Sequence, residues 1–135
     1  MLKDRLEYYY LKSDMNCAET ILHAAADEWN LPVNQSAFKA IAGFGAGCGC
    51  GRFCGAVAGG LATLGQMHID TRAHAAEGFA DRCAAFVEAA EAHLGSVQCE
   101  VLKAKYRTEE CRCLKTLELA AEVLEQHAAK SSDSV

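Results

Sequence analysis

Helix-breaking residues are concentrated in one stretch of this chain, and their distribution most strongly limits what it can fold into. Eight of the eleven glycines lie between Gly43 and Gly60, and the single proline is Pro32. Elsewhere alanine, leucine and glutamate dominate, and strand-like alternation of β-branched residues is absent. The sequence therefore predicts an all-α protein, a compact bundle of five to seven helices with a glycine-rich loop before a buried central helix. We find no repeat or linker, so residues 1–135 are expected to form a single domain.

Hydrophobic periodicity and capping residues predict where the helices begin and end. Pro32 separates the second and third helices, and Gly95 stops the fifth. Residues 130–135 are expected to form a frayed polar tail. The predicted helices cover residues 3–12, 15–29, a short segment starting near 34–36, 53–68, 72–93, a short segment after Ser96, and 108–129.

The chain contains eight cysteines, far above ordinary usage. With 135 residues and 51% hydrophobic residues it can bury a core without disulfide bonds. The first ten residues carry charges of both signs and lack the apolar run of a secretory signal, which predicts a reducing cytoplasmic location. The cysteines are therefore expected to act as thiols, metal ligands or transient disulfides.

The charge pattern excludes several functional classes. Thirteen basic and eighteen acidic residues give a net charge of −5 without a basic stripe, which argues against a nucleic-acid partner. Arg52 is the only formal charge from Ala40 to Ile69, but the glycines there favour a buried helix over a membrane span. No phosphate-binding loop or hydrolase triad is recognisable. The sequence does not identify a redox partner or fix the oligomeric state, and a homo-oligomer is compatible with it.

Cys54 lies where the glycine-rich stretch meets the predicted central helix. The unpaired N–H groups and the dipole at a helix start stabilise a thiolate, so we expect a lowered pKa for Cys54. Cys17, Cys99 and Cys113 also lie in or near the first turn of predicted helices. If these helix starts converge, the four thiolates share a pocket suited to an anionic cluster.

The remaining cysteines carry weaker signals. Cys83 lies in the middle of a predicted helix on an apolar stripe, where core packing is expected. Cys48 and Cys50 alternate with glycines and are free to turn toward Cys54, but their Cys-x-Cys-x-x-x-Cys spacing matches no zinc or ferredoxin-type motif. Cys111 is an additional candidate that lies on the same predicted helix as Cys113, on a different side.

The histidines and tyrosines add little to the candidate site. His23 follows Cys17 by six positions on one predicted helix, which makes it a weak candidate for ligation or proton transfer. The other histidines are scattered and are expected at the surface. The run Tyr8-Tyr9-Tyr10 is interpreted as packing and interface surface.

Several segments together resemble a family of small redox-active proteins. Phe44-Gly45-Ala46-Gly47, followed by Cys54-Gly55-Ala56-x-x-Gly59, resembles the family named for a CGAxxG motif and four characteristic cysteines, of the C_GCAxxG_C_C type. Segments 16–19, 95–102 and 113–121 are similar to its other three cysteine segments. The resemblance covers nearly the whole chain and maps the family's four cysteines onto Cys17, Cys54, Cys99 and Cys113.

The resemblance implies redox or metal chemistry without a known substrate, and a related domain occurs in a split-Soret type cytochrome associated with an iron–sulfur centre. Cys48, Cys50, Cys83 and Cys111 are additions to the family pattern. They leave the nuclearity of the site open.

Several functional hypotheses remain at this point. In the first, Cys17, Cys54, Cys99 and Cys113 ligate a metal centre, in particular an iron–sulfur cluster, that transfers electrons. Cys48, Cys50 and Cys111 are candidates for additional ligands, and Cys48 and Cys50 are alternatively a nearby thiol pair. In the second, the protein is a thiol–disulfide oxidoreductase, with Cys54 as nucleophile and Cys50, Cys48 or Cys17 as resolving partner. In the third, it carries copper(I) or zinc without turnover. In the fourth hypothesis, the protein is a helical bundle whose cysteines have no functional role. Whether the protein is an enzyme stays open.

Overall fold

The computed structural model describes residues 1–129, and within that range it confirms an all-α bundle. The predicted polar tail, residues 130–135, lies outside the described residues. The α-helices are α1 (Cys17–Trp29), α2 (Gln35–Ile41), α3 (Gly55–His68), α4 (Phe79–Leu94), α5 (Cys99–Tyr106) and α6 (Leu114–Ala129). Short helical turns are η1 (Leu2–Arg5), η2 (Tyr8–Lys12), η3 (Ala42–Phe44), η4 (Gly47–Gly51) and η5 (Ala73–Ala75).

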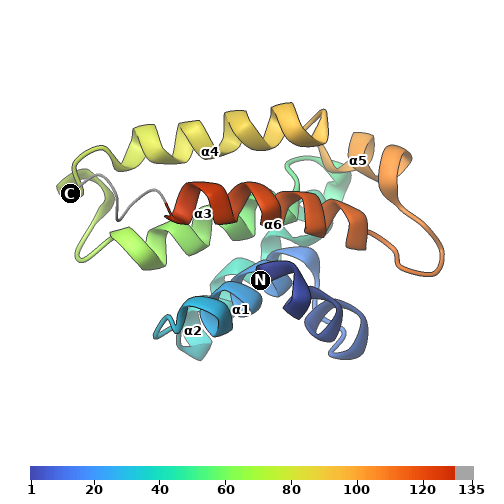
Figure 1. Cartoon of the computed structure of the whole chain (residues 1–135), viewed down its shortest axis with the longest axis horizontal. Helices are drawn as coiled ribbons and strands as arrows, with labels where there is room; N and C mark the ends of the chain where they lie inside the picture. Colours follow the sequence, from blue (N-terminus) through green and yellow to red (C-terminus); the bar gives the residue numbers. More distant parts are fainter. Residues whose placement is uncertain (130–135) are drawn as a thin grey trace.

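Helix α3 is the buried central helix that the sequence predicts. It contacts α1, α4 and α6, while α4 and α6 also pack on each other (Figure 1). Its first turns, from Gly55 to Gly60, are buried. The largest fully buried side chains come from several elements and form one core with it: Leu6, Ile21, Leu64, Phe86 and Leu124.

Small residues on α3 allow its neighbours to approach closely. A Cβ on Gly59 would lie 2.7 Å from the carbonyl oxygen of Ala18 and 2.9 Å from Cβ of Ile21, both on α1. A Cβ on Gly60 would lie 2.4 Å from the ring of Phe86 on α4. These glycines are needed for the close packing of α1 and α4 on α3.

Two predicted helix starts are wrong. The fifth helix was expected from residue 72, but α4 begins at Phe79, because Gly78 adopts a left-handed conformation with φ of +76° and residues 73–75 form only a short turn. The last helix was expected from residue 108, but α6 begins at Leu114. Thr108 pairs instead with Arg112, whose φ is +50°, so Cys111 lies in a loop and not on a helix.

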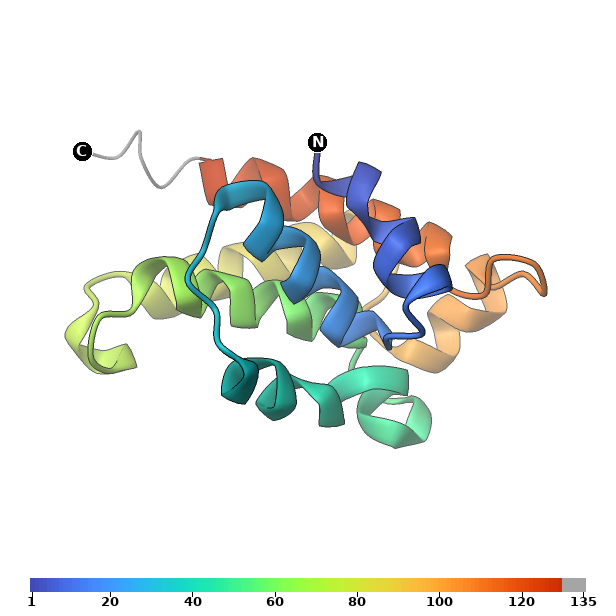
Figure 2. The same cartoon turned by 90° about the horizontal axis from the view of Figure 1, so that it is seen from below.

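The glycine-rich stretch contains the short turn η3 and a second turn, η4, whose backbone is non-helical at Cys48, Gly49 and Cys50, so the predicted glycine-rich loop before α3 is confirmed. Together with α2 it forms an arm that runs along one side of the bundle before α3 begins (Figure 2). None of the helices among the described residues has the length and apolarity that crossing a membrane requires.

Candidate functional site

Four cysteines lie at the starts of four helices. Cys17 and Cys99 are the first residues of α1 and α5, while Cys54 and Cys113 immediately precede the first turns of α3 and α6. In Figure 1 the starts of α1, α3 and α6 lie toward the right-hand side of the bundle, where α5 also lies. Cys17, Cys99 and Cys113 line one cavity of about 270 Å³. The positions predicted for these cysteines at helix starts are confirmed.

Backbone pairing holds Cys54 beside Cys99. The N–H of Cys54 donates to the carbonyl oxygen of Val97 at 2.7 Å, and the N–H of Cys99 donates to that of Arg52 at 2.5 Å. These bonds make a short antiparallel bridge between the segments that precede α3 and α5. Cys54 is 4% exposed and Cys99 is 8% exposed, so both thiols are withdrawn from solvent.

The N-cap of α1 fixes Cys17 beside the start of α3. Asn16 accepts a hydrogen bond from the N–H of Glu19 at 3.0 Å and donates through Nδ2 to the carbonyl oxygen of Ala42 at 2.8 Å. A Cβ on Gly55 would lie only 2.5 Å from Sγ of Cys17. The glycine after Cys54 therefore makes the room that Cys17 occupies.

Tyr10 holds the segment that carries Cys113. The N–H of Cys113 donates to the Tyr10 hydroxyl at 3.2 Å, and Nη2 of Arg112 donates to the Tyr10 carbonyl oxygen at 2.9 Å. The Arg112 guanidinium also lies over the Tyr10 ring, 4.5 Å from its centroid. Tyr10 is buried in the core, as the packing interpretation of the tyrosine run expects, and it also lines the thiol cavity.

Burial controls the protonation of the enclosed thiols. It raises the pKa of Cys54 to about 12, and the N–H groups of Val57 and Ala56 only partly oppose this effect. The lowered pKa predicted for Cys54 is therefore wrong, because desolvation outweighs the helix start. Burial likewise raises the pKa of Cys17 and of Cys99. These thiols are protonated at neutral pH unless a bound cation displaces their protons.

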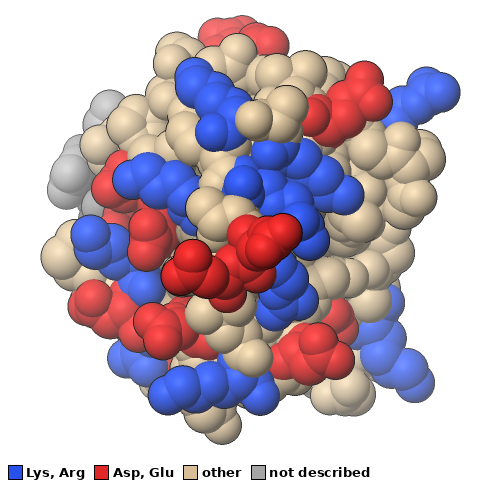
Figure 3. Space-filling model, turned by 90° about the vertical axis from the view of Figure 1, so that its right-hand side faces the viewer, with Lys and Arg blue, Asp and Glu red and all other residues tan. Residues whose placement is uncertain are grey.

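Basic side chains surround the same cavity. Lys103, Arg107 and Arg112 line it together with Asp14. Lysine and arginine side chains gather near the middle of this end of the molecule, with acidic side chains next to them (Figure 3). The cavity therefore combines three thiols with three cations, an arrangement that favours negative charge inside it. The sequence alone did not single out these cations.

The four cysteines do not form a ready-made site for a single ion. Across residues 1–129, no group of three or more cysteine, histidine, aspartate or glutamate side chains is placed to hold one metal ion. A structural zinc ion needs four donors, with sulfur atoms at about 2.3 Å. The thiols instead lie around a cavity, with Cys54 beside Cys17 and Cys99 and not on the cavity wall.

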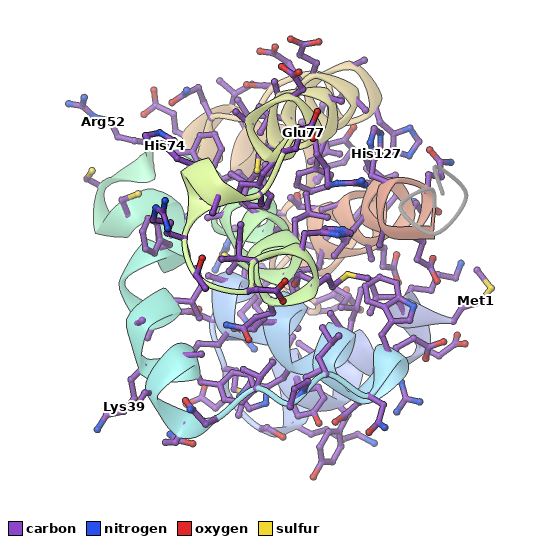
Figure 4. All side chains as sticks on the ribbon, turned by 90° about the vertical axis from the view of Figure 1, so that its left-hand side faces the viewer. Met1, Lys39, Arg52, His74, Glu77 and His127 are labelled. Carbon is purple, nitrogen blue, oxygen red and sulfur yellow. The ribbon has the colours of Figure 1, made fainter. Side chains whose placement is uncertain are left out.

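The other cysteines lie outside this cavity. Cys48 and Cys50 are exposed on η4, and Cys111 is exposed in the loop before α6. Arg52, directly after η4, extends outward from the same part of the molecule (Figure 4). Cys83 is half-buried on α4.

His23 packs between aromatic rings. Its ring lies 3.6 Å from that of Phe38 and 5.0 Å from that of Tyr9, stacked on both. Burial lowers the pKa of His23. It does not line the thiol cavity, so its arrangement is that of a packing residue.

Comparison with known proteins identifies a family. The model described as "Putative redox-active protein (C_GCAxxG_C_C)" matches residues 15–127, a range that includes Cys17, Cys54, Cys99 and Cys113. The name writes the central segment with glycine before cysteine, whereas this chain has Cys54 before Gly55. Curated proteins and solved structures give no match.

Proposed function

Because this chain belongs to the C_GCAxxG_C_C family of redox-active proteins, we propose that Cys17, Cys54, Cys99 and Cys113 form one redox centre that holds an iron–sulfur cluster and passes electrons. The observation that carries this proposal is that Cys17, Cys99 and Cys113, at the starts of three helices, line one cavity, while Cys54 at the start of a fourth helix lies beside Cys17 and Cys99. No other set of cysteines in residues 1–129 has this arrangement.

The donor set supports a cluster more than a single ion. Four thiolates are the usual ligand set of an iron–sulfur cluster, and the ligands of a [4Fe–4S] cluster each bind a different iron. Such ligands surround a volume and do not meet at a point. The cavity of about 270 Å³ between Cys17, Cys99 and Cys113 offers that volume, and Cys54 is the buried fourth donor.

The surroundings suit a negatively charged group. Lys103, Arg107 and Arg112 line the cavity, and helix starts carry N–H groups that favour the negative charge of thiolate and sulfide. Hydrogen bonds to cluster sulfur and limited solvent access are the features by which proteins adjust reduction potentials. A bound cluster would supply the one-electron chemistry, while this chain would hold it and tune it.

The burial of Cys54 distinguishes this proposal from disulfide exchange at the same residue. Exchange requires an accessible thiolate, whereas Cys54 is 4% exposed and burial raises its pKa to about 12. Metal binding removes the proton from a coordinating thiol outright, so a high pKa does not prevent ligation. The state of Cys54 therefore supports a ligand role over a nucleophile role.

Anaerobic purification followed by metal and sulfide analysis tests the proposal. We expect a coloured protein that contains iron and acid-labile sulfide in similar amounts, with visible absorbance that bleaches on reduction. Copper or zinc without sulfide would favour a metal carrier instead. Colourless protein that takes up neither iron nor sulfide on anaerobic reconstitution would refute the cluster.

A further inference from the structure

Cys48 and Cys50 form a second group of thiols, separate from the four cysteines at the helix starts. Both are exposed to solvent and neither lines the cavity. They lie on η4, and four successive residues there, beginning with Ala46 just before it, have positive φ: +54° at Ala46, +61° at Gly47, +61° at Cys48 and +76° at Gly49. A left-handed turn is costly for residues with a Cβ, so Cys48 is held in an unfavourable conformation.

The base of this turn is fixed while its tip is open. The N–H of Arg52 donates to the carbonyl oxygen of Gly47 at 2.9 Å, which closes the turn. A Cβ on Gly47 would lie 2.4 Å from Cβ of Cys99, so the base packs tightly on α5. A Cβ on Gly49, between the two cysteines, would meet nothing within 4 Å. Cys48 and Cys50 on either side of it are exposed, and Sγ of Cys50 donates a weak hydrogen bond to the carbonyl oxygen of Gly47 at 3.7 Å.

The backbone at Gly49 brings the two cysteines within reach of one another. Its φ of 76° and ψ of −1° are compact, not extended. With consecutive Cα atoms 3.8 Å apart, such a residue places the flanking Cα atoms about 5.5 Å apart, inside the range of about 4.4–6.8 Å found in disulfides. The Cα separation of Cys48 and Cys50 therefore meets the requirement for a disulfide between them.

We infer that Cys48 and Cys50 are a redox-active dithiol that reduces a disulfide presented by a partner molecule. One thiolate attacks the partner disulfide, forms a mixed disulfide and releases the first partner thiolate. The second cysteine then attacks the mixed disulfide, forms the Cys48–Cys50 bond and releases the second. Two electrons pass to the partner, and the two protons of the dithiol end on the two partner thiols. This activity goes beyond the proposed cluster and needs no part of it.

The other i, i+2 pair of cysteines is less suited to this reaction. Cys111 is exposed, but Cys113 is partly buried at the thiol cavity, where its N–H is bonded to Tyr10. Arg112 between them is held by the same tyrosine. Cys111 and Cys113 therefore form a matched comparison pair, with equal spacing but unequal access.

Dithiodipyridine is a small disulfide probe that tests the inference on the full chain. One equivalent is added anaerobically to reduced protein, and the product is digested with trypsin at acidic pH. Trypsin cleaves after Lys39 and after Arg52 and so releases a peptide of residues 40–52, whose only cysteines are Cys48 and Cys50. We expect this peptide to become lighter by two hydrogens while two molecules of thiopyridone are released per protein.

Single substitutions provide the controls. Cys48→Ser and Cys50→Ser should each release one thiopyridone from this peptide and retain a mixed disulfide, whereas Cys111→Ser should behave as the original chain. Circular dichroism checks that each variant is folded. If a variant is unfolded, the mass of peptide 40–52 from the unsubstituted protein alone decides whether the disulfide forms. The inference would be overturned if peptide 40–52 stayed reduced, carried two pyridyl groups or became joined to Cys54. It would also be overturned if the first disulfide formed between Cys111 and Cys113. Iron content tests the cluster separately.

Discussion

Substitution of Gly59 by alanine tests the close contact between α1 and α3. The new Cβ would lie 2.7 Å from the Ala18 carbonyl oxygen and 2.9 Å from Cβ of Ile21, so one helix must shift. Overpacking of this kind costs about 1–3 kcal/mol, and contact with backbone places Gly59 in the upper part of that range. Alanine recovers about 1 kcal/mol of helix propensity. We therefore expect a net loss of about 1–2 kcal/mol in the free energy of unfolding.

Gly65→Ala on the same helix is the matched control. A Cβ on Gly65 would meet nothing within 4 Å, so only the helix propensity should change, and stability should rise by about 0.5–1 kcal/mol. For 135 residues the entropy of unfolding is about 0.28 kcal/mol/K, so Gly59→Ala should lower Tm by about 4–7 °C while Gly65→Ala raises it by about 2–4 °C. Calorimetry on both variants measures this. A Gly59→Ala variant as stable as Gly65→Ala would refute the packing argument.

Three further predictions concern the site and its supports. Asn16→Ala should cost about 1–2 kcal/mol in urea unfolding, because it removes the N-cap of α1 and the bond to Ala42; an unchanged midpoint would contradict this role. Cys48→Gly should stabilise the protein by about 0.5–1 kcal/mol, because the strain of a left-handed residue exceeds the entropy that glycine loses; lower stability would argue against strain at this position. Burial raises the pKa of Cys54 from 9.0 to about 12, so the native state keeps a proton that the unfolded state loses, and metal-free protein should lose stability as pH rises between about 9 and about 12. Cys54→Ala should flatten that slope in urea unfolding across the pH series, and equal slopes would refute the assignment.

The helices that local signals define were predictable from the sequence. Asn34 caps α2, and Gly95 ends α4, as expected from their residue types. The start of α6 was not predictable, because Arg112 takes its left-handed conformation in a loop held by Tyr10, 102 residues away in sequence. The start of α4 was predictable in principle, since Gly78 is a visible breaker inside the expected helix.

The helix-start positions of the four cysteines were predictable from the sequence, but the electrostatics around them were not. Glycines and capping residue types locate helix starts to within a few residues, so Cys54 and Cys17 were expected near helix starts, although α1 begins at Cys17 behind an Asn16 cap and not at residue 15. The pKa of Cys54 depends on burial by distant segments, which no local pattern contains. Lys103 and Arg107 lie four residues apart near the end of α5, a spacing that marks one helix face but does not show that the face meets the thiols.

Iron and sulfide content across single cysteine-to-serine variants tests the central claim most directly. After anaerobic reconstitution under identical conditions, substitution at Cys17, Cys54, Cys99 or Cys113 should sharply lower bound iron and acid-labile sulfide or abolish their binding. Substitution at Cys48, Cys50, Cys83 or Cys111 should leave both near the level of the unsubstituted protein, with circular dichroism confirming the fold of each variant. Loss of iron from the second group, or full iron and sulfide retention in folded variants of the first, would contradict a centre built from the four helix starts.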